Sequence, residues 1–195
     1  MEVEWAKLDG SPAWSLEFEG KRLLSDSRLS LTTSGDGDLL NGASVVSKEN
    51  RRRRGRVAVL FGKASTAKDD FNEQRFSFKG KSGALYTVAF RCYDDAVAFR
   101  YEVPGSGAPI VVTDEASSFR LEGDPMAHVQ YLAHHRTSHE HNVSSTKYGA
   151  LRENTLIDTP ATFVWQDGAA VAITEAALRR YAGMSLVREG GALVS

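Results

Sequence analysis

The stretch ALYTVAFRCYDDAVAFRY, residues 84–101, decides the fold class of this chain. Residues 84–91 and 96–101 are rich in aromatic and β-branched side chains, which is typical of β-strands. Asp94 and Asp95 lie between them, and aspartate favours turns because its carboxylate accepts hydrogen bonds from the backbone two residues further on. The stretch therefore predicts two strands joined by a turn.

The same pattern recurs on both sides of this stretch. Turn signals such as Gly20-Lys21, Pro104-Gly105 and Asp167-Gly168 separate the apolar runs, and no sustained helical period competes with them. Further strands are predicted over residues 15–19, 22–24, 56–61, 75–78, 110–112, 161–165 and 170–173. Many short strands with little helix between them predict an all-β antiparallel sandwich. Without an internal repeat or a long linker, we expect a single domain over residues 1–195.

Composition limits the classes of partner. The 195 residues are 42% hydrophobic and 25% charged, as in an average soluble domain, and the net charge is -1. Such a chain has no global field to attract nucleic acid or an anionic membrane, so we expect neither partner. Cys92 is the only cysteine, which excludes an intramolecular disulfide and a cysteine-based zinc site. The first residues lack a signal-peptide pattern, and no run approaches the roughly 18 apolar residues of a membrane-spanning helix.

Glu175 is the first functional candidate. It follows the apolar strand predicted over residues 170–173, in the segment AAVAITEAALRRYAGMSL, residues 169–186. A carboxylate at the exit of a buried strand is costly without a partner, and strand exits commonly present ligand groups. The alternative is structural, with Glu175 forming an ion pair with Arg179 or Arg180.

All five histidines fall between residues 128 and 141, and His139-Glu140-His141 would place both imidazoles on one face if extended. A zinc or iron site needs a third ligand, and the glutamate that usually follows an HxH pair in double-stranded β-helix enzymes is replaced by Ser144, Ser145 and Thr146. The window predicts a surface loop with solvated histidines, with a sugar-facing loop and a metal site as alternatives.

Two kinds of charged cluster are not interpreted as functional sites. Arg51 to Arg54 with Arg56 form one basic run, but the interleaved aromatics that stack on bases are missing, so we expect a solvated loop leading into the strand at residues 56–61. Asp94-Asp95 and Asp114-Glu115 are paired acids, as glycosidases need. Adjacent strand residues point to opposite faces, so neither pair supplies both catalytic groups.

Residues 90–104, FRCYDDAVAFRYEVP, resemble the N-terminal domain of glycoside hydrolase family 97. The ending TEAAL…YAGMSL, residues 174–186, matches a second signature of that family, and the likeness covers roughly residues 16–186. Other landmarks occur in the family's order: Gly20-Lys21, Ser27-Arg28-Leu29, Leu60-Phe61-Gly62-Lys63, Phe71-Asn72-Glu73, Thr159-Pro160 and Asp167-Gly168.

The resemblance implies a β-super-sandwich akin to the galactose-mutarotase fold. It also implies a partner, a catalytic (β/α)₈ barrel of about 250 further residues that cleaves α-glucosidic or α-galactosidic bonds in α-linked oligosaccharides. The family's catalytic acid, base and nucleophile lie in that barrel, so no catalytic residue is assigned here. A periplasmic or secreted location follows if a signal peptide has been removed.

The resemblance also implies roles for three residues. Glu175 matches the position that lends one carboxylate to an interfacial calcium, and His139 and Glu140 lie where a family loop approaches the substrate. Calcium takes about six to eight oxygens, so the isolated chain should bind it weakly or not at all. Phe61 stands where the family tends to have tryptophan, which argues against an aromatic sugar platform there.

Two other functions stay open. One is a free-standing mutarotase-like enzyme with a histidine acid and a glutamate base, drawn from residues 128–141 and Glu175. The other is a noncatalytic carbohydrate-binding module. If no barrel covers it, the exposed apolar face predicts self-association.

Overall fold

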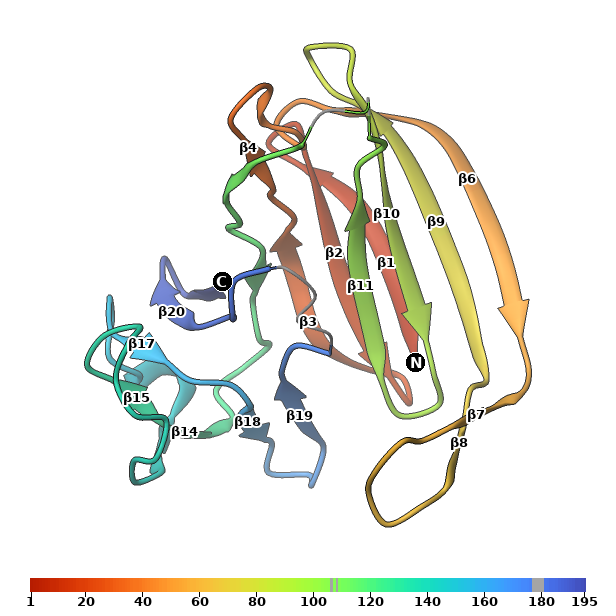
Figure 1. The fold of residues 1–195 in the computed structure, drawn as a ribbon. Helices are drawn as coiled ribbons and strands as arrows, with labels where there is room; N and C mark the ends of the chain where they lie inside the picture. Colours follow the sequence, from red (N-terminus) through yellow and green to blue (C-terminus); the bar gives the residue numbers. More distant parts are fainter. Residues whose placement is uncertain (106, 108, 177–180) are drawn as a thin grey trace.

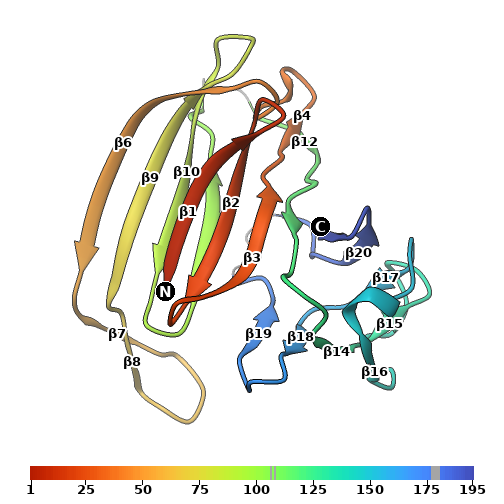
Figure 2. The same cartoon turned by 180° about the vertical axis from the view of Figure 1, so that it is seen from behind.

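The protein is seen here in a computed structural model that describes residues 1–105, 107, 109–176 and 181–195. These residues form an all-β fold whose one helical element is the short 3₁₀ turn η1 (Tyr148–Ala150). A larger sandwich and a smaller β region lie side by side (Figures 1 and 2). Neighbouring strands in every sheet run antiparallel, so the predicted fold class is confirmed. No helix in the described part of the chain is long and apolar enough to cross a membrane.

The first sheet of the sandwich is a meander of three strands. Its strands are β1 (Glu2–Leu8), β2 (Ser11–Phe18) and β3 (Lys21–Arg28), in that order. Gly10 and Gly20 close the two turns with φ values of 81° and 77°, a region that glycine enters without a steric penalty. Strand β1 is an edge strand, because it pairs only with β2.

The second sheet has four strands in the order β11-β10-β9-β6. They are β6 (Ser44–Arg53), β9 (Phe71–Lys79), β10 (Leu85–Cys92) and β11 (Val97–Glu102). The predicted turn at Asp94 and Asp95 joins β10 to β11, and Phe90 pairs with Phe99 across it. The stretch that decides the fold class therefore forms a hairpin.

Aromatic side chains fill the space between the two sheets. Trp5 of β1 packs on Phe76 of β9 with ring centroids 5.6 Å apart, and Trp14 packs on Phe90 and Phe99 at 5.8 and 5.7 Å. Such ring pairs contribute about 0.5–1.5 kcal/mol each beyond the area that they bury. These contacts join the two sheets of the sandwich.

The smaller region contains two sheets. One has the order β13-β21-β20-β17-β15 and the other β16-β14-β18-β19. The first comprises β13 (Ser118–Phe119), β15 (Tyr131–Leu132), β17 (Leu156–Ile157), β20 (Leu186–Glu189) and β21 (Ala192–Val194). The second comprises β14 (Met126–Val129), β16 (Ser144–Lys147), β18 (Ala161–Val164) and β19 (Ala170–Ile173). Buried residues of both regions form one continuous core cluster, and a bridge between Leu24 and Leu121 joins them.

Five shorter strands complete the fold. They are β4 (Thr32–Thr33), β5 (Gly37–Asp38), β7 (Arg56–Ala58), β8 (Thr66–Lys68) and β12 (Val112–Asp114). β7 and β8 form a hairpin that projects from the sandwich (Figure 1). Leu60 and Phe61 at its tip are 93% and 85% exposed, so the strand predicted over residues 56–61 ends early, at Ala58.

The prediction of a solvated loop at the arginine run is wrong for Arg51, Arg52 and Arg53, which lie in β6. Arg51 pairs with Glu73 and Arg53 with Phe71 across the β6–β9 ladder. The side chains are exposed because β6 is an edge strand, and charged residues on an edge discourage pairing with other chains. Backbone pairing therefore overrides the polarity on which the loop prediction depended.

Candidate functional site

Glu175 lies two residues after β19, at the strand exit that the sequence predicts. Its side chain is half-buried, and Oε1 accepts a hydrogen bond from the backbone N–H of Met184 at 3.0 Å. A Cβ atom added to Gly183 would lie 3.7 Å from the same oxygen, so the main chain packs closely against the carboxylate. Oε2 accepts no hydrogen bond from the described residues. One oxygen is held in place and the other can meet a ligand.

The two arginines that the structural alternative assigns to Glu175, Arg179 and Arg180, lie outside the described residues. The observed partner is a backbone amide. An amide donor holds the carboxylate without neutralising its charge, which suits a ligand for a cation.

A chain of hydrogen bonds leads from Glu175 to the histidine loop. The carbonyl of Met184 accepts from Thr159 Oγ1 at 3.5 Å, and the Thr159 N–H donates to Asp158 Oδ1 at 2.9 Å. Asp158 Oδ2 lies 2.9 Å from His139 Nδ1. The predicted metal ligand and the predicted substrate-side histidine thus lie at two ends of one connected network.

Gln130 fixes the loop that carries His139 and Glu140. Its Nε2 donates to the carbonyl of His139 at 2.6 Å and to Asp158 Oδ2 at 3.1 Å, while its Oε1 accepts from the N–H of His141 at 3.2 Å. Asp158 is the less exposed of the two partners, since its side chain is 12% exposed and that of His139 is 59% exposed. Glu140 is exposed, and its N–H donates to Ser138 Oγ at 3.2 Å. The loop presents one imidazole and one carboxylate to the surroundings on an ordered backbone.

The other histidines do not converge on a metal position. His128 lies in β14, with Nδ1 2.9 Å from Ser145 Oγ, and His134 Nδ1 accepts from the N–H of Arg136 at 3.1 Å. His139 and His141 lie in an irregular loop rather than an extended strand. Among the residues that the structure describes, no three histidine, cysteine or acidic side chains are grouped as metal ligands need.

The predicted calcium ligand, Glu175, belongs to no larger group of metal-ligating side chains in the part of the chain that the structure describes. Glu175 supplies one carboxylate, and the described ranges contain no group of three or more histidine, cysteine or acidic side chains around it. Calcium requires about six to eight oxygen ligands. Further oxygen ligands would be needed beside the Glu175 carboxylate.

One residue of each acidic pair has hydrogen-bond partners within the domain. Asp94 lies in the β10–β11 turn, and the hydrogen bond from Lys68 Nζ at 2.8 Å lowers the pKa of its carboxyl group. Glu115 accepts hydrogen bonds from the hydroxyls of Tyr181 and Ser117 at 2.7 and 3.1 Å. These acids stabilise turns and loops.

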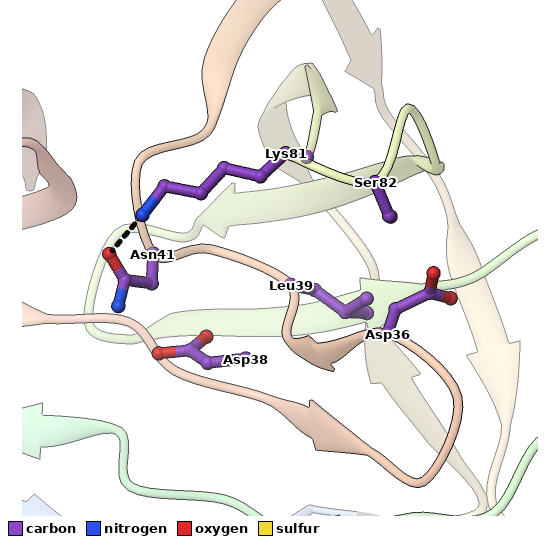
Figure 3. Close-up of a pocket in the computed structure, with 7 residues that line it drawn as sticks. Asp36, Asp38, Leu39, Asn41, Lys81 and Ser82 are labelled. Atoms are coloured by element: carbon purple, nitrogen blue, oxygen red, sulfur yellow. Dashed lines mark hydrogen bonds between the residues drawn. The ribbon is translucent and has the colours of Figure 1, made fainter.

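A small pocket of about 120 Å³ lies elsewhere, between the turn before β6 and the β9–β10 turn (Figure 3). Lys81 Nζ donates to Asn41 Oδ1 at 3.3 Å across it, and Asp36 and Asp38 line its opposite side. None of the candidate residues Glu175, His139 and Glu140 lines this pocket.

Sequence reasoning missed the residues that hold the site together, Gln130 and Asp158. Asp158 directly precedes Thr159-Pro160, one of the landmarks of the family resemblance. That position is the only feature of the sequence that could have indicated a role for Asp158. No feature of the sequence indicates a role for Gln130, because that role depends on a loop that folds back over it.

Comparison with known proteins supports one family. The model of the family described as "Glycosyl-hydrolase 97 N-terminal" matches residues 1–193. A probable retaining α-galactosidase from Streptomyces bingchenggensis is 30% identical over 179 residues, which cover 88% of this chain and 26% of that protein. A retaining α-galactosidase from Bacteroides thetaiotaomicron is 26% identical over 193 residues, which cover 92% of this chain and 28% of that protein.

Solved structures support the same fold. A glycoside hydrolase family 97 enzyme from Pseudoalteromonas sp. strain K8, in complex with acarbose, matches 98% of this chain with a TM-score of 0.85 and 26% identity. The match covers 30% of that enzyme, so this chain spans less than a third of the length of these relatives. The resemblance stated from the sequence motifs is confirmed. This chain belongs to the glycosyl-hydrolase 97 N-terminal family.

Proposed function

We propose that this chain is the noncatalytic N-terminal domain of a calcium-dependent α-glycosidase, and that it braces a catalytic (β/α)₈ barrel and lines one side of its active site. The carrying observation is the Glu175 carboxylate, fixed by the amide of Met184 and connected through Asp158 to the ordered loop of His139. A preorganised carboxylate loses little freedom when it binds a cation.

The substrate class follows from the relatives. Two are named α-galactosidases, and a third is a family 97 enzyme in complex with acarbose. Their names support an α-linked oligosaccharide as the substrate of the intact enzyme. His139 and Glu140, exposed on a loop fixed by Gln130, are the side chains of this domain that we expect to contact that substrate.

Glu175 fits the role of one calcium ligand among several. Its Oε1 is occupied by the Met184 amide, and Oε2 is the oxygen left for the ion. The remaining ligands would come from the barrel and from water, because the described residues do not complete the shell. The ion, when bound, would polarise sugar oxygens, while this chain would only hold the Glu175 carboxylate in position.

Calorimetry with calcium is the first test. We expect weak or absent binding to this chain, and tight binding to the chain joined to its barrel. Glu175→Gln should weaken calcium binding in the joined protein by at least tenfold and lower kcat/KM on nitrophenyl α-galactoside or α-glucoside. Glu189→Gln, which removes an exposed carboxylate at the end of β20, should change neither quantity.

Two results would overturn the proposal. One is tight calcium binding to this chain alone that Glu175→Gln abolishes, since the site would then be complete without a barrel. The other is turnover by this chain alone. Conversion of freshly dissolved α-glucose would favour the mutarotase alternative, with His139 as acid and Glu175 as base.

A further inference from the structure

A groove of about 360 Å³ opens between the start of β1, at Met1 and Val3, and the inner face of the second sheet. Six polar residues from two strands line it, namely Asn50, Arg51 and Arg52 of β6 and Asn72, Glu73 and Gln74 of β9. Its volume lies within the range of small-ligand pockets, which is about 300–1,000 Å³. The groove shares no residue with the Glu175 and His139 site.

Strand register shows why these polar residues are unusual. Asn50 pairs with Gln74 and Arg52 with Asn72, and Gln74 lies two residues from the buried Phe76. Side chains two apart in a strand share a face, so Asn50, Arg52, Asn72 and Gln74 all point to the side of the sheet that faces β1 and β2. On that face a sandwich normally carries apolar residues.

The polar face is open because the two sheets differ in width. The first sheet has three strands and ends at β1, whereas the second has four and ends at β6. The Trp5 side chain of β1 reaches Phe76 of β9, but the strand β1 itself lies over β10, and β9 and β6 extend past it (Figure 2). The inner face of β6 is therefore exposed although it belongs to the interior side of the sandwich.

The groove offers both donors and acceptors. Asn50 Oδ1 accepts from Gln74 Nε2 at 3.0 Å, and Asn72 Oδ1 accepts from Arg54 Nη2 at 3.4 Å. These bonds leave the Asn50 amide N–H₂ group, Gln74 Oε1 and the Arg52 guanidinium without a hydrogen-bond partner in the described part of the chain. A sugar hydroxyl both donates and accepts, so it can satisfy such a mixed set.

Apolar residues and one acidic residue also border the groove. Val3 lines the groove beside the polar groups and is partly exposed, so it can contact the C–H face of a sugar, whereas Phe90, which also borders the groove, is buried. Glu73 also borders it, but its carboxylate is engaged by Arg91 Nε at 2.6 Å and by Arg75. No histidine lines the groove, so no imidazole is available there as a general acid or base. These residues suit the binding of a sugar rather than its cleavage.

We propose that this groove binds one or two sugar units of an α-linked saccharide, as a second carbohydrate site on the domain. The choice of a saccharide rests on the proposed function. Asn50, Arg52 and Gln74 would bind the hydroxyls, and the site would hold substrate chains to the enzyme without cleaving them.

The test is a titration of this chain with maltotriose and with melibiose, followed by amide NMR. We expect saturable shifts for the side-chain amides of Asn50 and Gln74 and for the backbone amide of Val3. Asn50→Ala and Arg52→Ala should each weaken binding at least tenfold. Both residues are exposed, so neither variant should affect folding.

Arg53→Ala is the matched control. Arg53 lies on the opposite face of the same strand and pairs with Asp69 at 2.7 Å, so its loss removes the same charge without altering the groove. Binding should persist in this variant.

Three results would overturn the inference: no saturable shift in the groove, equal weakening by Arg53→Ala and Arg52→Ala, or binding of inorganic phosphate in place of both sugars. None of these results bears on the Glu175 proposal, which is tested separately by measuring calcium binding and kcat/KM. Conversely, Glu175→Gln should leave groove binding unchanged.

Discussion

Glu175 and Met184 are joined by a hydrogen bond of 3.0 Å from the backbone N–H of Met184 to Oε1 of the carboxylate. The bond connects the exit of β19 with the segment that leads into β20, and so connects two sheets of the smaller region. The geometry of the candidate calcium ligand is therefore a property of the tertiary fold. Variants at this position separate its structural role from its charge.

Glu175→Ala should destabilise this chain by about 1 kcal/mol, because the half-buried Met184 N–H loses its acceptor. Glu175→Gln should cost less, since the amide oxygen of glutamine still accepts that bond. Urea denaturation of both variants checks the difference. Equal losses would show that the Met184 bond contributes nothing to stability.

Asp158→Ala should release the histidine loop. Asp158 accepts hydrogen bonds from Gln130 Nε2 and the Thr159 N–H and contacts His139, and its side chain is 12% exposed. Loss of these bonds should cost about 2 kcal/mol and speed hydrogen exchange over residues 133–143. Exchange mass spectrometry measures the effect.

Glu140→Ala serves as the control for Asp158→Ala, because it removes an exposed carboxylate from the same loop. Its exchange rates and stability should match those of the unmodified chain. If both variants exchanged alike, the Asp158 anchor would have no role.

Glu73 should make stability depend on acid pH. Burial of its carboxylate raises the pKa, but the hydrogen bond and charge of Arg91, together with Arg75, outweigh burial and hold the pKa below its ordinary value. In the unfolded chain the pKa returns to about 4.3. The stabilisation is therefore complete at neutral pH and is lost as the pH falls below about 4.3, through the lowered folded value.

Glu73→Gln should accordingly destabilise the chain by about 2 kcal/mol at pH 7, and the gap to the unmodified chain should narrow in acid. Denaturation at a series of pH values from 7 to 3 measures both effects. Glu49→Gln, which breaks an exposed pair with Arg51, should change stability by less than about 0.5 kcal/mol. A gap that stayed constant with pH would contradict the role of the Glu73 charge.

Leu60 and Phe61 should drive association of the isolated chain. Their side chains are 93% and 85% exposed at the tip of the β7–β8 hairpin, and large exposed apolar groups favour contact with other surfaces. Replacing both by serine should reduce self-association in sedimentation while leaving the denaturation midpoint unchanged, since neither side chain is buried. Leu85→Ser is the control, because Leu85 is 56% exposed but lies on β10, away from the hairpin tip; this variant should not reduce self-association. A monomer before and after substitution would contradict the prediction.

Much of the fold could be predicted from residue patterns. The hairpin around Asp94 and Asp95 was correct because aromatic and β-branched runs flank a turn-forming pair. β6 was missed because its arginines carry no apolar alternation, and it pairs only because β9 offers a complementary ladder. The sequence analysis also misses β1, although Glu2–Leu8 alternates between polar and apolar residues.

Glu175 was identified as a candidate from its sequence, whereas its surroundings came from the fold. Local composition placed a carboxylate after an apolar strand, and motifs indicated the family that the comparisons show. The bonds of Met184, Thr159 and Asp158 that connect Glu175 to His139 include three that join residues 9, 25 and 19 positions apart in the chain.

The sequence by itself determined the all-β class, the turns and the identity of the carboxylate, because those depend on side-chain shape and on contacts between near neighbours. Only the tertiary structure decided which groups meet: Gln130 with the histidine loop, Asp158 with His139, and the polar face of β6 with an open groove. These arrangements depend on long-range packing and on the unequal widths of two sheets. No periodicity in the sequence encodes them, since they arise only when strands distant in the chain are brought side by side.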